Sequence, residues 1–210
     1  MLRVGLFLYC VSSPSSSLPF SKFQRQIISM STDSTPNLIL GSGSKTRKDI
    51  LSDMGFSTTI IKPDIDERSI GDRSAGTAKA ADLVLLLGNA KADAVLSVLT
   101  SEHKNSILVT ADQVVVCGGQ ILEKPKDADE VRSFIQGYGV NPCGTIGSIV
   151  LTDVRTGIRV EGVDSTTIHF RPIPDDVVER LIEEGDVYYC AGGLMIENPL
   201  VAPYIMSVDG

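Results

Sequence analysis

Residues 106–116 constrain the fold more than any other part of this sequence. The segment reads SILVTADQVVV and is rich in β-branched side chains, which favour strands. Asp112 and Gln113 interrupt its apolar run at a place that should lie in the middle of a sheet. Burying an unpaired carboxylate costs on the order of several kcal/mol, so a metal, a cation or an opening to solvent must compensate Asp112. The segment therefore predicts a central strand, or a bent pair of strands, that carries a general base or a metal ligand; the alternative is an aspartate at a strand end, hydrogen-bonded to the backbone.

Helix-like and strand-like segments alternate on both sides of this run, which is typical of an α/β domain. At 210 residues the chain is long enough for one domain with a full apolar core. Apolar spacing and turn signals predict helices at 46–54, 78–99, 127–137 and 174–184. The same signals predict strands at 37–40, 56–61, 106–116, 145–152 and 160–170. Asp127 and Glu130 have the spacing of a capping box at the start of the third helix, and Gly185 ends the last one.

Composition narrows the function classes. The formal net charge of −7 argues against general nucleic-acid binding, although a small anionic ligand fits if cations converge locally. No apolar stretch approaches the roughly 20 residues of a membrane-spanning helix, so we expect no membrane association. Two histidines and widely spaced cysteines provide neither a zinc site nor a disulfide framework, which favours a reducing, cytoplasmic location. The cysteines are Cys10, Cys117, Cys143 and Cys190.

The amino-terminal segment differs from the rest in composition. It contains three basic side chains and a run of serines but no acidic residue before Asp33, which is the composition of an organellar transit segment. The alternatives are a mitochondrial or plastid leader and a disordered tail with Met30 as a second start. We therefore expect a disordered leader or a transit segment over residues 1–35 and the folded domain over residues 36–210.

A glycine- and serine-rich segment, GSGSKTRK, lies between the first strand and the first helix. Small residues let backbone N–H groups approach a phosphate, and the start of a helix favours an anion. Lys45, Arg47 and Lys48 add positive charge behind it. The segment is not a P-loop, because Ile39 and Ser44 occupy the two positions that must be glycine. The alternative is an ordinary strand-to-helix turn capped by a serine.

Two further polar segments flank the central run. The acidic turn PDIDER contains Asp64, Asp66 and Glu67, whose hard oxygen atoms suit Mg²⁺, although exposed turns are also acidic for solubility alone. Beyond the run, Lys124 precedes Pro125 and is expected to be extended. If a hairpin returns Lys124 to the neighbourhood of the central carboxylate, its ammonium can neutralise charge on a phosphoryl group; the alternative is a solvated loop lysine.

Read in order, these segments resemble the Maf family, the septum-formation-like nucleotide pyrophosphatases. The matching segments are LILGSGSKTRKDIL, PDIDER, NAKADAV, TADQVVV, LEKPKDADE and CAGGLMIENPL, which span residues 37 to about 210. The resemblance implies an elongated α/β fold with a mixed sheet in two lobes, shared with inosine-triphosphate pyrophosphatases. It implies hydrolysis of modified or non-canonical nucleoside triphosphates to the monophosphate and pyrophosphate, as a housecleaning reaction. It also implies a divalent cation, Mg²⁺ or Mn²⁺, and a homodimer.

The resemblance assigns catalytic roles to five positions. Asp112 matches the proton acceptor, and Glu67 and Asp112 are the expected metal ligands. Arg47, Lys91 and Lys124 match cations that would stabilise the departing pyrophosphate. We therefore expect these five side chains to converge on one ligand.

Substrate contacts follow from the same resemblance. Ser42 matches the serine of the first motif, and Thr46, Gln113 and Glu197 match positions associated with substrate choice. Gln113 resembles the residue that the family branch associated with 7-methyl-GTP carries at this position. A threonine at this position is instead typical of the branch that favours dTTP and UTP.

Two departures from the family pattern leave an alternative open. The usual P-R-R reads Lys45, Thr46 and Arg47, so one arginine is missing, and lysine lacks the bidentate phosphate contact of arginine. The chain also stops at Gly210, before the G-L-P segment and final helix of the family. The alternative function is a catalytically weakened nucleotide-binding regulator of cell division.

Overall fold

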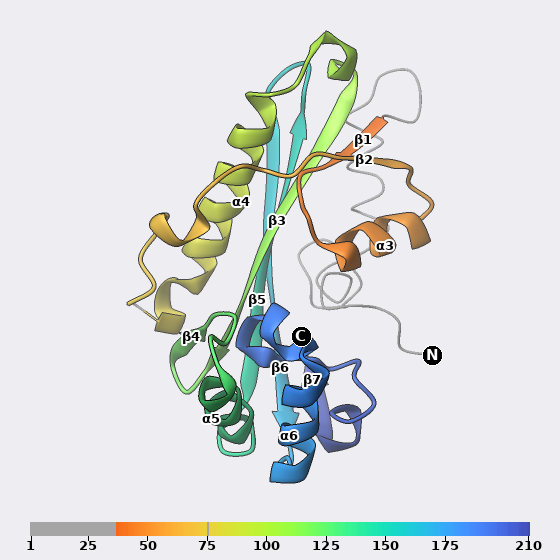
Figure 1. Cartoon of the computed structure of the whole chain (residues 1–210). Helices are drawn as coiled ribbons and strands as arrows, with labels where there is room; N and C mark the ends of the chain where they lie inside the picture. Colours follow the sequence, from red (N-terminus) through yellow and green to blue (C-terminus); the bar gives the residue numbers. More distant parts are fainter. Residues whose placement is uncertain (1–36, 75) are drawn as a thin grey trace.

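The computed structural model describes residues 37–74 and 76–210, so the expected leader lies outside the described residues (Figure 1). The helices are α3 (Lys45–Asp53), α4 (Ala80–Leu96), α5 (Ala128–Tyr138) and α6 (Asp175–Glu184). The strands are β1 (Asn37–Leu40), β2 (Thr58–Ile60), β3 (Ser106–Cys117), β4 (Gln120–Leu122), β5 (Cys143–Asp153), β6 (Arg159–Phe170) and β7 (Ile205–Asp209). Every predicted helix and strand is confirmed, with ends that differ by a few residues. Short 3-10 turns join them: η1 (Glu67–Ser69), η2 (Gly76–Lys79), η3 (Ser101–His103), η4 (Asp186–Tyr189), η5 (Ala191–Gly193) and η6 (Ala202–Tyr204).

The strands form one mixed sheet. Its order is β2-β1-β3-β5-β6-β7, and β4 pairs with β3 off this path. β1 is parallel to both β2 and β3, whereas the other pairs are antiparallel. Figure 1 shows β3, β5 and β6 running along the length of an elongated molecule. The predicted α/β class and the central position of residues 106–116 are therefore confirmed.

One face of this sheet is covered by α4. Side chains of a strand alternate between the two faces, so even-numbered positions of β3 point toward α4. Leu108 accordingly packs in a cluster with Ala92 and Val95 of α4. Further along, Val114 packs in a second cluster with Leu83 and other α4 residues. The helix spans the middle of the sheet, and Asp112 lies on this face between the two clusters.

The opposite face carries two separate clusters, which form the two lobes. In the first, Leu51 of α3 packs with Leu38 of β1 and with Val109 of β3. In the second, Val115 packs with α5, α6 and the 3-10 turns that follow α6, through residues such as Ile135. Between these clusters on the same face of β3, Ala111 is buried and Gln113 is half-buried.

Local caps explain the helix starts near the site. Asp127 Oδ1 accepts a hydrogen bond from the Glu130 amide at 2.9 Å, as expected for the start of α5. The return bond of a full capping box does not form, because Glu130 Oε2 accepts from the Lys126 amide at 2.8 Å instead. At the end of α6, Gly185 adopts a φ of 79°, a left-handed conformation that favours glycine.

Two other expectations concern cysteines and membranes. Cys117, Cys143 and Cys190 are free thiols. Within residues 37–74 and 76–210, no helix combines the length and apolar character that crossing a bilayer would require.

Candidate active site

The buried carboxylate of β3 has a cation as its partner. Asp112 Oδ1 lies 2.5 Å from Nζ of Lys91, which projects from α4. Both side chains are almost wholly buried, with exposed fractions of 9% and 6%. The same ammonium lies 3.1 Å from Oε1 of Glu67, whose side chain is about half exposed. Lys91 therefore joins the carboxylate from the centre of the sheet to the carboxylate of the acidic turn.

Two hydrogen bonds from the sheet hold α4 close enough for this pairing. Thr110 Oγ1 donates to the Gly88 carbonyl at 2.8 Å, and Ser148 Oγ donates to the Val84 carbonyl at 2.6 Å. A methyl group on Gly88 would lie 2.9 Å from Ser148 Oγ, so the glycine permits the close approach. Sequence reasoning assigned no role to Thr110, Ser148 or Gly88, because a contact between a strand and a distant helix leaves no local pattern, even for Thr110 at the start of the TADQVVV segment.

Burial governs the protonation of Asp112. Loss of hydration raises the pKa of the Asp112 carboxyl above its ordinary value, and the negative charge of Glu67 raises it further. The positive charges of Lys91 and Arg47 oppose this rise. Burial also lowers the pKa of Arg47, while Asp112 and Glu67 oppose the change. The guanidinium nevertheless stays charged, because its ordinary pKa is so high.

The turn after β1 brings Ser42 and Arg47 together. Arg47 Nη1 donates to Ser42 Oγ at 3.2 Å, and the Ser44 amide donates to the same oxygen at 3.1 Å. Ser44 is the N-cap of α3, and its Oγ accepts from the Arg47 amide at 3.4 Å. The expected serine cap is thus present. The turn also holds Arg47 where its charge acts on the buried carboxylate.

An arginine that sequence reasoning missed organises the acidic turn. Arg73 Nη2 donates to the Glu67 carbonyl at 2.8 Å, and Arg73 Nη1 donates to the Ile70 carbonyl at 2.9 Å. The Nε atom of Arg73 forms an ion pair with Glu123. Because Glu123 directly precedes Lys124, one guanidinium links the turn that carries Glu67 to the loop that carries Lys124. No sequence signal distinguished Arg73 from other loop arginines.

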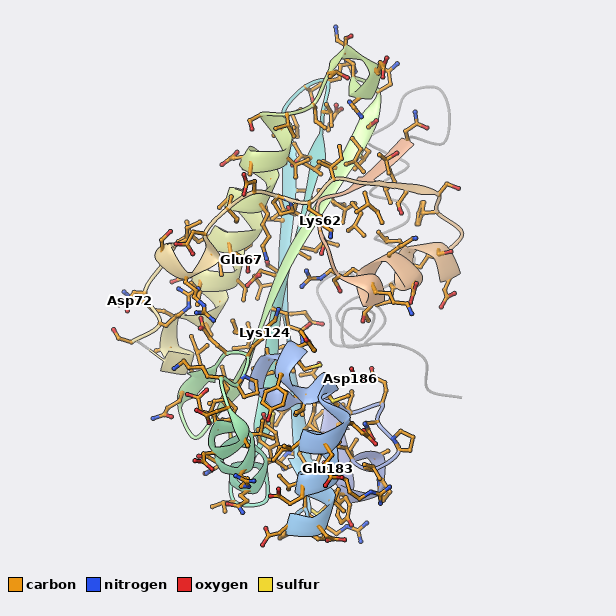
Figure 2. All side chains as sticks on the ribbon, in the orientation of Figure 1. Lys62, Glu67, Asp72, Lys124, Glu183 and Asp186 are labelled. Carbon is orange, nitrogen blue, oxygen red and sulfur yellow. The ribbon has the colours of Figure 1, made fainter. Side chains whose placement is uncertain are left out.

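Lys124 does not contact Asp112. The β3–β4 hairpin places Leu122 opposite Val115, and Lys124 follows two residues later. Its exposed ammonium forms no ion pair or hydrogen bond with another residue in the described part of the chain. Figure 2 shows Lys124 and Glu67 in the middle of the molecule, between its two ends. Lys124 is thus unpaired among the described residues, and its role beside Asp112 stays a prediction.

The residues expected to govern substrate choice are spread around the site. Thr46 is exposed in the first turn of α3, and Gln113 lies on the face of β3 opposite Asp112. Glu197 is exposed. Burial raises the pKa of the Cys190 thiol, the charges of Asp186 and Glu197 raise it further, and the charge of Lys124 lowers it. Glu197 and Lys124 therefore both act on Cys190, whereas Gln113 does not share the face of Asp112.

The donor set suits a hard divalent cation. Among residues 37–74 and 76–210, no group of three or more histidine, cysteine, aspartate or glutamate side chains is placed to hold a metal. The two carboxylates that meet at Lys91 are nevertheless adequate for Mg²⁺, which keeps several waters and bridges to substrate phosphates. Asp64 and Asp66 of the same turn are exposed, and Asp66 Oδ1 accepts from the Arg68 amide at 3.2 Å as the cap of η1.

An elongated mixed sheet, with a buried carboxylate at its centre paired with a lysine and influenced by an arginine, defines an α/β protein with a charged site on its central strand. The family model described as Maf-like protein matches residues 37–210. The chain therefore belongs to the Maf-like protein family, as the sequence motifs predict.

Curated relatives agree with this family. A 7-methyl-GTP pyrophosphatase of Dictyostelium discoideum is 39% identical over 177 residues, which cover 82% of this chain and 86% of the relative. A 7-methyl-GTP pyrophosphatase of Idiomarina loihiensis is 35% identical, with coverage of 77% and 78%. A dTTP/UTP pyrophosphatase of Vibrio vulnificus is 31% identical, with coverage of 82% and 87%. Each of these relatives is similar to this chain along most of both lengths.

Proposed function

We propose that this chain is a nucleoside triphosphate pyrophosphatase that converts its substrate to the monophosphate and pyrophosphate. The observation that carries the proposal is the three-residue cluster in which Lys91 joins Asp112 to Glu67. Relatives at 39% and 35% identity are named as pyrophosphatases, which supports the same reaction class. An α/β fold alone would not support it, because one fold hosts many activities.

Asp112 is the proposed general base. Burial raises the pKa of Asp112 toward neutral pH, where a general base is most effective. The positive charge of Lys91 meanwhile favours the ionised carboxylate, which is the form that accepts a proton. Asp112 accepts a proton from the attacking water, and the water oxygen forms a bond to the α-phosphorus. The bond between the α-phosphorus and the bridging oxygen breaks, and that oxygen leaves with pyrophosphate.

Glu67 and Asp112 would hold a divalent cation, Mg²⁺ or Mn²⁺. When bound, such a cation supplies Lewis-acid polarisation and neutralises phosphate charge. Glu67 fits this role because its side chain is half exposed and its Oε1 already lies 3.1 Å from a positive group. The backbone contact from Arg73 keeps the glutamate at this position.

Arg47, Lys91 and Lys124 are the proposed electrostatic partners of the departing pyrophosphate. Arg47 and Lys91 are held by Ser42 and by the carboxylates, so they are oriented before a ligand arrives. Lys124 is exposed and adds its charge from the second lobe. Ser42 supports the turn against which the phosphates would lie.

A 7-methylated guanosine triphosphate is the proposed substrate, ahead of dTTP or UTP. The relatives at 39% and 35% identity are named 7-methyl-GTP pyrophosphatases, and the dTTP/UTP pyrophosphatase shares 31%. Gln113, which the family resemblance associates with the former branch, is half-buried on β3. Thr46 and Glu197 would contribute to the choice from α3 and from the second lobe.

A panel of nucleoside triphosphates tests the proposal. Purified protein is incubated with 7-methyl-GTP, GTP, dTTP, UTP and ATP, with and without Mg²⁺, and the products are identified by chromatography. We expect monophosphate and pyrophosphate in equal amounts, fastest with 7-methyl-GTP and absent after chelation. Binding without monophosphate formation would instead favour the regulatory alternative.

Light scattering of the same preparation tests the expected homodimer.

A further inference from the structure

Lys62 lies at the same edge of the sheet as the Ser42 turn. β1 and β2 are parallel, so their carboxyl ends meet at one edge, where α/β proteins commonly bind ligands. Ser42 follows the end of β1 by two residues, and Lys62 follows the end of β2 by two residues. The Ile61 amide donates to the Leu40 carbonyl at 3.1 Å, which holds the two chain exits side by side.

The side chain of Lys62 lies along the backbone of this turn. A methyl group built on Gly43 would lie 3.3 Å from Cε of Lys62, 3.5 Å from Cδ and 3.7 Å from Cγ. The aliphatic part of the lysine thus occupies the space that a side chain at position 43 would fill. Because Gly43 is the neighbour of Ser42, the Lys62 ammonium lies beside the turn that holds Arg47.

The charge of Lys62 is not used within the protein. Lys62 is exposed, and it forms no ion pair with any residue that the structure describes. By contrast, Lys91 is paired with Asp112 and Glu67. The charges of Arg47 and Lys91 together only balance these two carboxylates. Beyond the cation and Lys124 of the proposed function, Lys62 is therefore a further positive charge available to a polyphosphate, and Figure 2 shows Lys62 above and Lys124 below Glu67.

We propose that Lys62 is a phosphate-binding residue, whose ammonium contacts the polyphosphate chain of the ligand beside the Ser42 turn. This inference rests on the proposed function for its ligand class. The alternative is a lysine that only covers Gly43 with its aliphatic chain. A hydrogen bond to a charged group contributes about 1.5–3 kcal/mol, which corresponds to roughly a tenfold to hundredfold change in affinity.

The test compares Lys62→Gln and Lys62→Arg with Lys104→Gln, a matched control. Lys104 is also exposed, but it lies in the turn just before β3, at the end of that strand away from Asp112. Calorimetry with inorganic tripolyphosphate and Mg²⁺ measures binding, and the triphosphate assay measures KM and kcat. Lys62→Gln is expected to weaken tripolyphosphate binding at least tenfold, and Lys62→Arg is expected to stay within about threefold of wild type. Lys104→Gln should bind like wild type.

The outcomes separate this inference from the proposed function. Equal tripolyphosphate affinity in Lys62→Gln and Lys104→Gln overturns the inference, even if wild-type protein hydrolyses triphosphates normally. Weak binding by Lys62→Gln in a protein without turnover supports the inference and contradicts the proposed function. A wild-type protein that binds no tripolyphosphate contradicts the inference as well. Melting temperatures of all three variants check that each one is folded.

Discussion

The two sides of the site are built differently. On the α4 side, Lys91 and Asp112 are buried and held by a helix that packs tightly on the sheet. On the loop side, Glu67 and Lys124 are exposed, and Arg73 is the side chain that links their two segments. The buried side is oriented before a ligand binds, whereas the loop side can adjust to it. This difference predicts large effects from changes under α4 and smaller ones from changes in the loops.

Asp112→Asn is the change expected to have the largest effect. The amide keeps the shape of the side chain but cannot accept a proton from water, so kcat should fall by about 10²–10⁴-fold. Loss of a buried charge also removes a desolvation cost, so the fold should remain intact. Triphosphate turnover and circular dichroism measure both effects, and a folded variant with wild-type pyrophosphate release would exclude Asp112 as the base.

Lys91→Met should reduce stability more than any loop variant. It leaves Asp112 buried without its main partner, which costs about 3–5 kcal/mol when the carboxylate is ionised. The pKa of Asp112 would rise further, so the penalty should grow as pH increases above the ordinary aspartate value and should disappear at lower pH. Denaturant unfolding across pH measures this trend. A destabilisation that does not depend on pH would indicate a packing defect instead.

Arg73→Gln should affect the loop side alone. Without the guanidinium, the turn that carries Glu67 is no longer linked to Glu123, so the Mg²⁺ concentration for half-maximal activity should rise about fivefold, equivalent to roughly 1 kcal/mol. The unfolding midpoint should change little, because the Arg73–Glu123 pair is partly exposed. A matched Glu123→Gln variant and the double mutant test the link. Additive effects of the two substitutions would show that the pair does not act as a unit.

The smallest expected effect is a shift in the acidic midpoint of the pH profile of kcat/KM. Because burial raises the pKa of Asp112, the acidic limb of kcat/KM should have its midpoint above the ordinary aspartate value of about 3.9. Activity is present above that midpoint and lost as pH falls through it. Glu67→Gln removes a negative neighbour that raises the pKa, so its midpoint should shift to lower pH. An unchanged midpoint in this variant would place the titrating group elsewhere.

Most of the fold was predictable from the sequence, because strand and helix periodicities are local. The central strand, the helix stopped by Gly185 and the helix that starts at Asp127 all follow from patterns within a dozen residues. The predicted ends of the strands were less accurate. The strand predicted at residues 56–61 is the shorter β2 (Thr58–Ile60), because neighbouring strands decide where pairing stops. The capping box at α5 also failed to close, because a Lys126 amide competed for Glu130.

The site was predictable only in part. The motifs identified Asp112, Glu67 and Lys91, but Arg73 and Lys62 were missed. Each is a single basic residue in a polar segment, and their contacts with Glu123 and Gly43 cross long stretches of chain. Lys124 was expected to act beside Asp112 if the hairpin returns it there, and this stays a prediction, because Lys124 forms no ion pair within residues 37–74 and 76–210. Such placements depend on how segments pack rather than on local pattern.

The sequence by itself determined the alternation of elements and the presence of a charged group within an apolar strand, since both are properties of neighbouring residues. Only the tertiary structure decided that Lys91 would neutralise that group and that Glu67 would share the same ammonium. It also decided that Lys62 and Lys124 would form no ion pair within the described part of the chain. The physical reason is that a buried charge selects its partner by distance in space. That distance depends on the close packing of α4, through Gly88, against Ser148 of β5.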